Sequence, residues 1–213
     1  MTVPLALYGC SGHAKVVLDA IRLQQNYEVV AVLDDRAPGT RALEFSGVPI
    51  IGGREALAGL AKLGVQHVML AFGDCEARLA LANLVRCAGL QCAVVMHPRA
   101  VVAGDVQLGS GTFVAAAAVI NTESTIGENV IVNTSASIDH DCAVGDGVHI
   151  CPGVHLAGRV TVGRGAWIGI GSTVRDGVAI GAGAFVGAGS VVLRDIPDQV
   201  VAYGVPARVV RNR

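Results

Sequence analysis

A six-residue repeat that runs unbroken through residues 102–192 is the most constraining feature of this sequence. Every sixth residue is aliphatic, and the residue four places further on is small or β-branched. A fixed period of this kind predicts a solenoid, in which each repeat packs only against its neighbours. The aliphatic positions are Val102, Leu108, Val114, Ile120, Ile126, Val132, Ile138, Val144, Ile150, Leu156, Val162, Ile168, Val174, Ile180, Val186 and Val192.

Six residues suffice for one short strand and one corner. We expect the aliphatic side chain to point inward and the small residue to fit near the next corner. A glycine often follows the aliphatic residue, and we expect it to adopt the positive φ of a sharp corner. Three sides would close a coil, and about five coils stacked ~4.8 Å apart would give a prism roughly 24 Å tall. The alternative is an ordinary antiparallel β domain, which the unbroken repeat disfavours.

Residues 4–96 have a different pattern, in which apolar strands alternate with helical periods. This alternation predicts βαβ units and a parallel sheet. His97–Arg99 is the expected hinge, which gives an N-terminal domain of residues 1–97 and a solenoid domain of residues 98–213. We expect strands at 5–8, 29–33, 48–51, 67–72 and 91–96, and helices around Val16, Val17, Ala20 and Ile21, at 55–63 and at 76–88.

Three loops follow strands of the predicted sheet, at residues 9–13, 34–35 and 73–74. Ligands of parallel sheets bind at the carboxyl ends of strands, often on a helix N-terminus. A glycine loop lets backbone N–H groups approach a phosphate, and acidic side chains accept bonds from ribose hydroxyls or a base N–H. The three loops together indicate a Rossmann-like nucleotide site. Gly9 and Gly12 form an incomplete dinucleotide fingerprint, and an ordinary tight turn is the alternative for that loop alone.

One solenoid segment, residues 133–142, is more polar than the rest and places His140 between Asp139 and Asp141. A histidine with a neighbouring carboxylate suits general base catalysis near neutral pH. Either aspartate is a candidate for orienting the ring, and a solvated corner is the alternative interpretation. His149 and His155 are six residues apart and so occupy equivalent places on successive faces of the prism.

Composition excludes several classes of protein. The net charge of −1 gives no reason to expect a nucleic-acid partner. The longest apolar run, residues 113–120, is far shorter than the ~20 residues of a membrane helix, and the first residues lack a basic signal-peptide region. The six cysteines form no C-x-x-C pair, which favours a reduced, cytoplasmic protein. Arg211 and Arg213 are expected in a frayed terminus.

The loops Tyr8–His13, Leu33–Asp35 and Phe72–Asp74, the segment 133–142 and the closing Gly204–Ala207 resemble one family over about residues 4–210. They are similar to the bacterial nucleotide-amino-sugar N-acetyltransferases of the hexapeptide-repeat family. That group includes the bacillosamine-pathway UDP-4-amino-sugar acetyltransferase, the GDP-perosamine N-acetyltransferase and the sialic acid O-acetyltransferase. The resemblance implies a Rossmann-like α/β domain followed by a left-handed parallel β-helix. It also implies a homotrimer with acetyl-CoA between adjacent prisms and no metal.

The resemblance further implies roles for individual residues. His140 matches the general base and Asp141 the acid that supports it. Ala188 stands where a relative has Gly, and Asp74–Cys75 replaces an Asn-Asn pair beside the substrate, which leaves the sugar open. The residues matched to the nucleotide-sugar are Ser11, Gly12 and His13 at the phosphates, Asp34 and Asp35 at the nucleoside, and Gly73; those matched to acetyl-CoA are His149, Ile170, Ala188 and, more loosely, Gly158.

The expected reaction is transfer of acetyl from acetyl-CoA to the 4-amino group of a UDP-linked 4-amino-4,6-dideoxy sugar, for a bacterial surface glycan or glycoprotein. GDP-perosamine N-acetylation and sialic acid O-acetylation are alternatives. A zinc lyase with His140, His149 and His155 across a subunit interface is a further one, although the N-terminal domain and the Gly204–Ala207 segment have no role in it. A non-catalytic nucleotide-sugar sensor is disfavoured by the intact Asp139–Asp141 segment.

Overall fold

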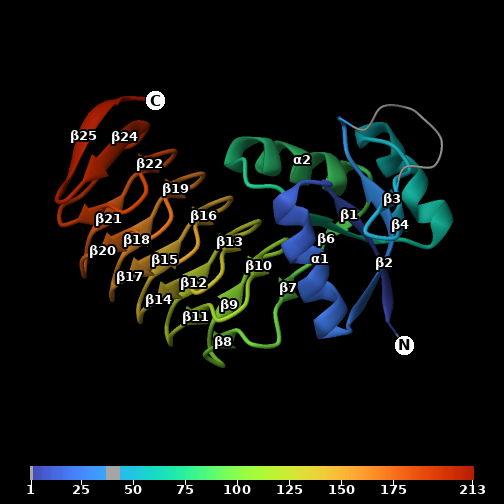
Figure 1. The fold of residues 1–213 in the computed structure, drawn as a ribbon, viewed down its shortest axis with the longest axis horizontal. Helices are drawn as coiled ribbons and strands as arrows, with labels where there is room; N and C mark the ends of the chain where they lie inside the picture. The colour runs from blue at the N-terminus through green and yellow to red at the C-terminus, as the bar shows by residue number, and fades with distance from the viewer. Residues whose placement is uncertain (1, 37–43) are drawn as a thin grey trace.

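A computed structural model of the chain describes residues 2–36 and 44–213. It confirms an N-terminal α/β domain followed by a left-handed parallel β-helix (Figure 1). Within the described residues, no helix has the length and apolar character to cross a membrane.

The α/β domain is built on a parallel four-stranded sheet with helices on both faces. Alternate side chains of its strands point to opposite faces, so Leu5 and Leu7 pack against α1 while Ala6 and Tyr8 pack on the side of η1 and α2. The strands lie in the order β2 (Tyr27–Leu33), β1 (Val3–Tyr8), β5 (His67–Leu70) and β6 (Gln91–Cys92); the helices are α1 (Gly12–Gln24), η1 (Arg54–Leu63) and α2 (Cys75–Cys87), and β3 (Glu44–Phe45) pairs with β4 (Val48–Pro49).

Five local predictions differ from the structure. Residues 54–63 form a 3₁₀-helix, whose period of three aligns the buried Leu57 and Leu60. Val16 is exposed, because α1 turns its neighbours inward instead. The strand expected at 67–72 ends at residue 70, and the strand expected at 48–51 is reduced to β4. The strand expected at 91–96 is two strands, of which only β6 joins the α/β sheet.

The solenoid is a three-sided prism whose strands up to β23 pair residue i with residue i+18, as the six-residue period predicts. Face 1 is an eight-stranded sheet, face 2 has six strands and face 3 has five. Face 1 contains β7 (Val95–Met96), β10 (Phe113–Val114), β13 (Ile131–Val132), β16 (His149–Ile150), β19 (Trp167–Ile168), β22 (Phe185–Val186), β24 (Val200–Gly204) and β25 (Ala207–Asn212). Face 2 contains β8 (Val101–Val102), β11 (Val119–Ile120), β14 (Ser137–Ile138), β17 (His155–Leu156), β20 (Thr173–Val174) and β23 (Val191–Val192); face 3 contains β9 (Gln107–Leu108), β12 (Thr125–Ile126), β15 (Ala143–Val144), β18 (Thr161–Val162) and β21 (Ala179–Ile180).

The interior of the prism confirms the predicted side-chain pattern but corrects the predicted corner. From Val114 to Val192 all inward aliphatic residues are buried, and so are the small residues that follow them. Positive φ occurs three residues after the aliphatic one, as at Asp141 with φ 59°, and not at the glycine next to it. That glycine is needed for space instead, because a Cβ on Gly163 would stand 2.4 Å from the backbone of the next coil.

Face 1 of the prism and the α/β domain share one hydrophobic core. Helix α1 contributes Val17 and Ile21, and the outer side of face 1 contributes Phe113 and Ile131. The described α/β domain is therefore packed firmly against one side of the solenoid.

The C-terminal residues are ordered rather than frayed. Strand β25 pairs antiparallel with β24, and Arg213 donates hydrogen bonds from its backbone N–H to Gln199 and from its side chain to the Gly183 carbonyl oxygen. This hairpin extends face 1 beyond the last coil, and β25, most of whose residues are exposed, forms the outer edge of that sheet.

Candidate active site

A cavity of about 510 Å³ lies at the carboxyl ends of β1, β2 and β5. The structure brings together there the three loops that the sequence indicates, with Ser11, Asp34, Asp35 and Gly73 in the lining. Gly12 begins α1, and His13 is turned towards the solenoid, where its ring lies 5.6 Å from that of Phe113.

The two aspartates of this cavity are already engaged by protein groups. Asp34 is buried and accepts hydrogen bonds from the Cys10 N–H at 2.9 Å and the Arg36 N–H at 2.8 Å. Burial alone would raise the pKa of Asp34, but the bonds from Arg36 and Cys10 lower it well below its ordinary range. The Asp34 carboxylate oxygens therefore hold the backbone of residues 10 and 36 in place.

Asp35 is likewise held by hydrogen bonds from protein groups, here Tyr8 and Arg54. It accepts the Tyr8 hydroxyl at 2.5 Å and the Arg54 guanidinium at 2.6 Å, and the bond from Arg54 is the main reason that its pKa falls to about 2. Arg36 and Arg54 thus stand at the cavity wall as cations fixed by aspartates. Sequence reasoning missed both arginines, because nothing local marks them as cavity residues.

A second, smaller cavity of about 300 Å³ lies on face 1, at the corner where the chain passes to face 2. His149, Ile170 and Ala188, which the sequence matches to acetyl-CoA, all line it. Trp167 and Phe185 also line it, with rings stacked 6.0 Å apart and inclined by 11°, and sequence reasoning did not single them out.

Two histidines at the boundary between these cavities are held in the neutral form. Burial, and then the Arg78 cation, lower the pKa of His149 to about 3 and that of His13 to about 4. Their rings lie 6.1 Å apart, and the His149 ring packs edge-on against Trp167 at 4.3 Å. Near neutral pH both rings are therefore uncharged hydrogen-bonding groups.

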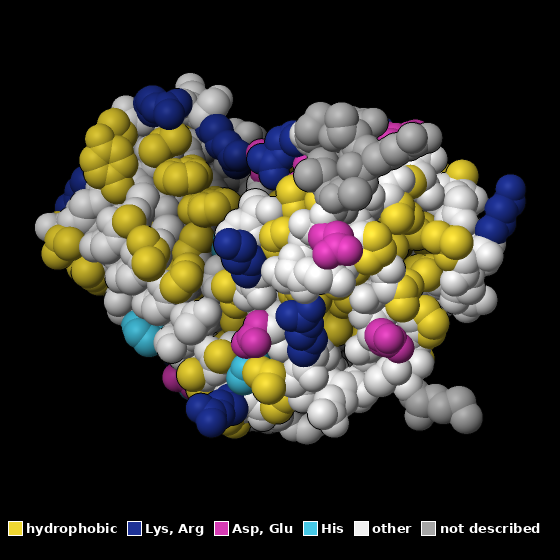
Figure 2. Space-filling view, turned by 45° about the vertical axis from the view of Figure 1, so that its right-hand side comes forward, with side chains coloured by type: hydrophobic (Ala, Val, Ile, Leu, Met, Phe, Trp, Pro, Cys, Tyr) yellow, Lys and Arg dark blue, Asp and Glu magenta, His cyan; other side chains and the backbone are white. Residues whose placement is uncertain are grey.

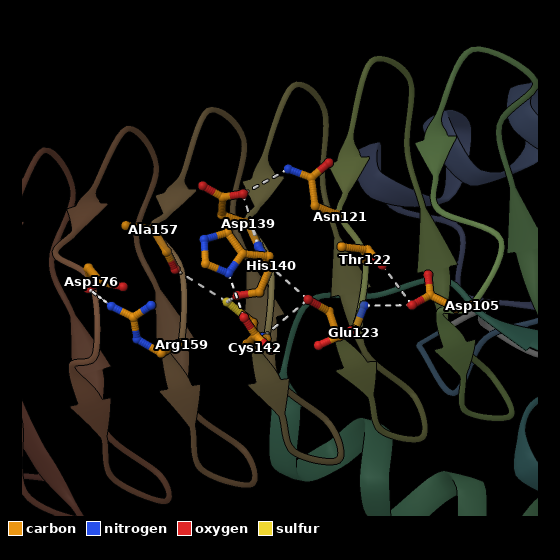
Figure 3. A network of polar contacts seen from close by, with 12 residues as sticks. Asp105, Asn121, Thr122, Glu123, Asp139, His140, Cys142, Ala157, Arg159 and Asp176 are labelled. Carbon is orange, nitrogen blue, oxygen red and sulfur yellow. Dashed lines mark hydrogen bonds and ion pairs between the residues drawn. The ribbon is translucent and has the colours of Figure 1, made fainter.

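His140 and Asp141 occupy a different part of the prism, the corner between faces 2 and 3, which we call the distal vertex (Figure 3). Asp141 Oδ2 lies 2.6 Å from His140 Nδ1, whereas Asp139 accepts the backbone N–H of His140 and the side-chain amide of Asn121. The structure thus resolves the choice between the two acids: Asp141 orients the ring and Asp139 the backbone. The bond to Asp141 raises the pKa of His140, as suits a proton acceptor.

Gly158 lies beside the His140 ring in the next coil. A Cβ at this position would stand 2.6 Å from both Cε1 and Nε2 of His140. Gly158 therefore belongs with the distal vertex and does not line the cavity of face 1.

The three histidines of the lyase alternative have separate partners. His140 binds Asp141, His149 binds the Gly73 carbonyl oxygen, and His155 Nδ1 lies 2.8 Å from the Ser137 hydroxyl on face 2. Among residues 2–36 and 44–213 no group of three or more His, Cys, Asp or Glu side chains is arranged to hold a metal ion.

Comparison with protein families matches residues 4–85 to the PglD N-terminal domain and residues 159–194 to the bacterial transferase hexapeptide repeats. A search of curated proteins gave no match.

Several solved structures match almost the whole chain. The acetyltransferase domain of PglB from Neisseria gonorrhoeae, solved with acetyl coenzyme A, is 34% identical with a TM-score of 0.91, covering 99% of this chain and 100% of its own. PerB from Caulobacter crescentus, solved with CoA and GDP-perosamine, is 41% identical with a TM-score of 0.91, covering 97% of each chain. A perosamine N-acetyltransferase variant from the same organism, with one histidine replaced by asparagine, is 42% identical with a TM-score of 0.93, covering 98% of this chain and 97% of its own.

Gly158→Ala should disturb His140 without unfolding the chain. The added methyl meets the ring, so we expect the bond to Asp141 to weaken and the pKa of His140 to fall towards about 6.5. An NMR titration of the ring C–H resonances measures this, with Tm recorded in parallel. Gly104→Ala, in the same column of the distal vertex but facing open space, is the matched control. An unchanged His140 titration in Gly158→Ala would contradict the assignment.

Proposed function

The chain belongs to the bacterial nucleotide-amino-sugar N-acetyltransferases of the hexapeptide-repeat family, and we propose that it acetylates the 4-amino group of a nucleotide-linked 4-amino-4,6-dideoxy sugar, with acetyl-CoA as donor. The observation that carries the proposal is the pairing of a His140–Asp141 dyad with a nucleotide-sized cavity in one chain. Relatives of this length and fold that bind acetyl-CoA, or CoA with GDP-perosamine, support it.

The dyad accounts for the proton transfers of this reaction. Asp141 accepts the Nδ1–H of His140, which leaves Nε2 free to take a proton. As the amine nitrogen bonds to the thioester carbonyl carbon, Nε2 removes one proton from that nitrogen. The carbon–sulfur bond then breaks, and His140 returns the proton to the departing sulfur, so the products are the N-acetyl sugar and CoA. The exposed His140 needs no metal and no acyl-enzyme for these steps.

We propose a homotrimer whose active sites are shared between subunits. In a triangular prism the corner between faces 2 and 3 is opposite face 1, so His140 points away from the cavities that its own chain forms at face 1. A second copy must therefore bring its distal vertex to those cavities. Hydrophobic side chains gather on the visible surface of the solenoid (Figure 2), and exposed Ile170, Tyr203, Val205 and Val209 offer apolar area for such a contact.

The proposal extends to the nucleotide that carries the sugar and to the pathway that uses the product. The resemblance of the Leu33–Asp35 loop to the bacillosamine-pathway enzyme favours a UDP sugar, for a bacterial surface glycan or glycoprotein. GDP-perosamine is the second candidate, and the higher identity to PerB, 41% against 34% for PglB, supports it. Sialic acid O-acetylation is the remaining alternative. Six free cysteines support a reducing, cytoplasmic location.

A thiol-release assay tests the reaction and its substrate. Purified protein is given acetyl-CoA with UDP-4-amino-4,6-dideoxy-N-acetylglucosamine, GDP-perosamine or free sialic acid in parallel. We expect rapid CoA release with one amino sugar, and loss of at least about 100-fold in His140→Ala because the general base is removed. Release with sialic acid alone would move the protein to O-acetylation, and full activity of His140→Ala would refute the base.

The pH dependence of kcat/KM should report the state of His140. The base must be neutral, so activity rises as pH passes upward through the pKa of His140, which Asp141 holds above its ordinary value. Asp141→Asn removes the carboxylate and keeps a residue that tolerates positive φ. This variant should shift the rising limb to lower pH, towards about 6.5, and lower the plateau about 10- to 100-fold. A limb that stays in place would mean that another group titrates.

Mixing two inactive variants tests the shared site. His140→Ala lacks the base and Ile170→Glu blocks the face 1 cavity. Refolded or co-expressed as a 1:1 mixture, they should regain about a quarter of wild-type activity, because that share of interfaces pairs two intact halves. A mixture as inactive as its parents would place each complete site within one subunit.

A further inference from the structure

Arg78 is a completely buried arginine at the junction of the two domains. It extends from α2, and its Nε donates to the Asn129 carbonyl oxygen at 2.9 Å while Nη2 donates to that of Gly147 at 2.7 Å. Its Nη1 turns back to its own domain and donates to the Gly73 carbonyl oxygen at 2.9 Å. Within the described residues, the guanidinium donates hydrogen bonds to backbone carbonyl oxygens and to the Cys75 sulfur, and to no carboxylate.

The Gly73 carbonyl oxygen also determines the state of His149. His149 Nδ1 lies 3.3 Å from this oxygen, which can only accept, so the His149 proton sits on Nδ1. The unprotonated Nε2 then accepts from the Asn133 side-chain nitrogen at 3.2 Å. Asn133 cannot be turned the other way round, because its Oδ1 already accepts the Thr134 backbone N–H at 2.8 Å. Every donor and acceptor in this series is thereby assigned.

We propose that Arg78 is a positioning residue for acetyl transfer, which fixes the Gly73 carbonyl, through it the tautomer of His149, and through His149 the amide of Asn133. The inference rests on the proposed function, since His149 and Asn133 line the face 1 cavity assigned to acetyl-CoA. Asn133 keeps one N–H hydrogen free for a ligand in that cavity. Arg78 thus links the nucleotide-sugar domain to the coenzyme groove through hydrogen bonds of stated direction.

The surroundings of His149 resist the other protonation states. An imidazolium would present an Nε2–H to the amide N–H of Asn133, and donor would face donor. Arg78 from α2 and His13 from α1 each lower the pKa of His149 beyond the effect of burial, whereas the hydrogen bond to the Gly73 carbonyl oxygen raises it. The neutral ring with its proton on Nδ1 is the form that satisfies all its neighbours.

Two-bond ¹H–¹⁵N correlation spectra of the histidine rings test the proposal, because they distinguish the two neutral tautomers and the cation. In the wild-type protein His149, assigned from the signal lost in His149→Gln, should show Nδ1–H and no titration between pH 8 and pH 5. Protonation on Nε2, or titration in this range, overturns the proposal whether or not any Arg78 variant folds.

Arg78→Lys keeps the cation but loses the fork that reaches both domains. We expect a mixture of His149 tautomers and a KM for acetyl-CoA raised about tenfold, the size expected for loss of one hydrogen bond, with kcat less affected. Arg86→Lys is the matched control, because Arg86 lies on the same helix and pairs with Glu128 at the surface. A folded Arg78→Lys with wild-type tautomer and KM overturns the inference.

The two proposals fail in different ways. If the chain is no acetyltransferase, wild-type protein releases no CoA but the His149 tautomer is unaffected. If Arg78 has only a structural role, wild-type protein turns over normally, and Arg78→Lys changes Tm while leaving the tautomer and KM unchanged.

Discussion

The buried guanidinium of Arg78 is the polar constraint that ties the two domains to each other. Taking an unpaired cation out of water costs several kcal/mol, and here carbonyl dipoles from both domains offset it. Five N–H groups in a rigid fork suit this task, since the carbonyls of loop 72–74 and of the solenoid corners approach from different directions. The apolar contacts of α1 with Phe113 and Ile131 hold the domains together, and Arg78 fixes their register.

The surroundings of the histidines near that junction and of the histidine at the distal vertex favour different protonation states. His13 and His149 lie against the buried cation, in a site that disfavours their charged forms. His140 lies at the exposed distal vertex, where a carboxylate favours the charged form. One residue type is thus held neutral in one place and favoured in its charged form in another, and the environment alone decides which.

Much of the fold was predictable from the sequence, because a six-residue repeat determines each side of the prism locally. The inward aliphatic side chains, the 18-residue pairing and the meeting of three loops at the carboxyl edge of the sheet were expected and are observed. The position of positive φ was mispredicted, because glycine serves two needs in this coil, backbone freedom and close approach of the next coil. Arg54 and Arg78 were missed because their partners are distant in the sequence or depend on how the domains dock, and Arg36 because its pairing with Asp34, two residues away, depends on how the loop folds. The choice between Asp139 and Asp141 needed side-chain directions that spacing does not provide.

The coils of the prism repeat at a constant spacing along its axis. Every position on the distal vertex recurs after 18 residues, as the column formed by Thr122, His140 and Gly158 shows. The domain junction takes its solenoid partners from two successive coils, at Asn129 and at Gly147. A coil inserted between them would move these two carbonyl oxygens apart by one strand spacing, about 4.8 Å, and Arg78 could no longer reach both. Although the coils look interchangeable in the sequence, the number of coils at the junction is therefore fixed by a single side chain.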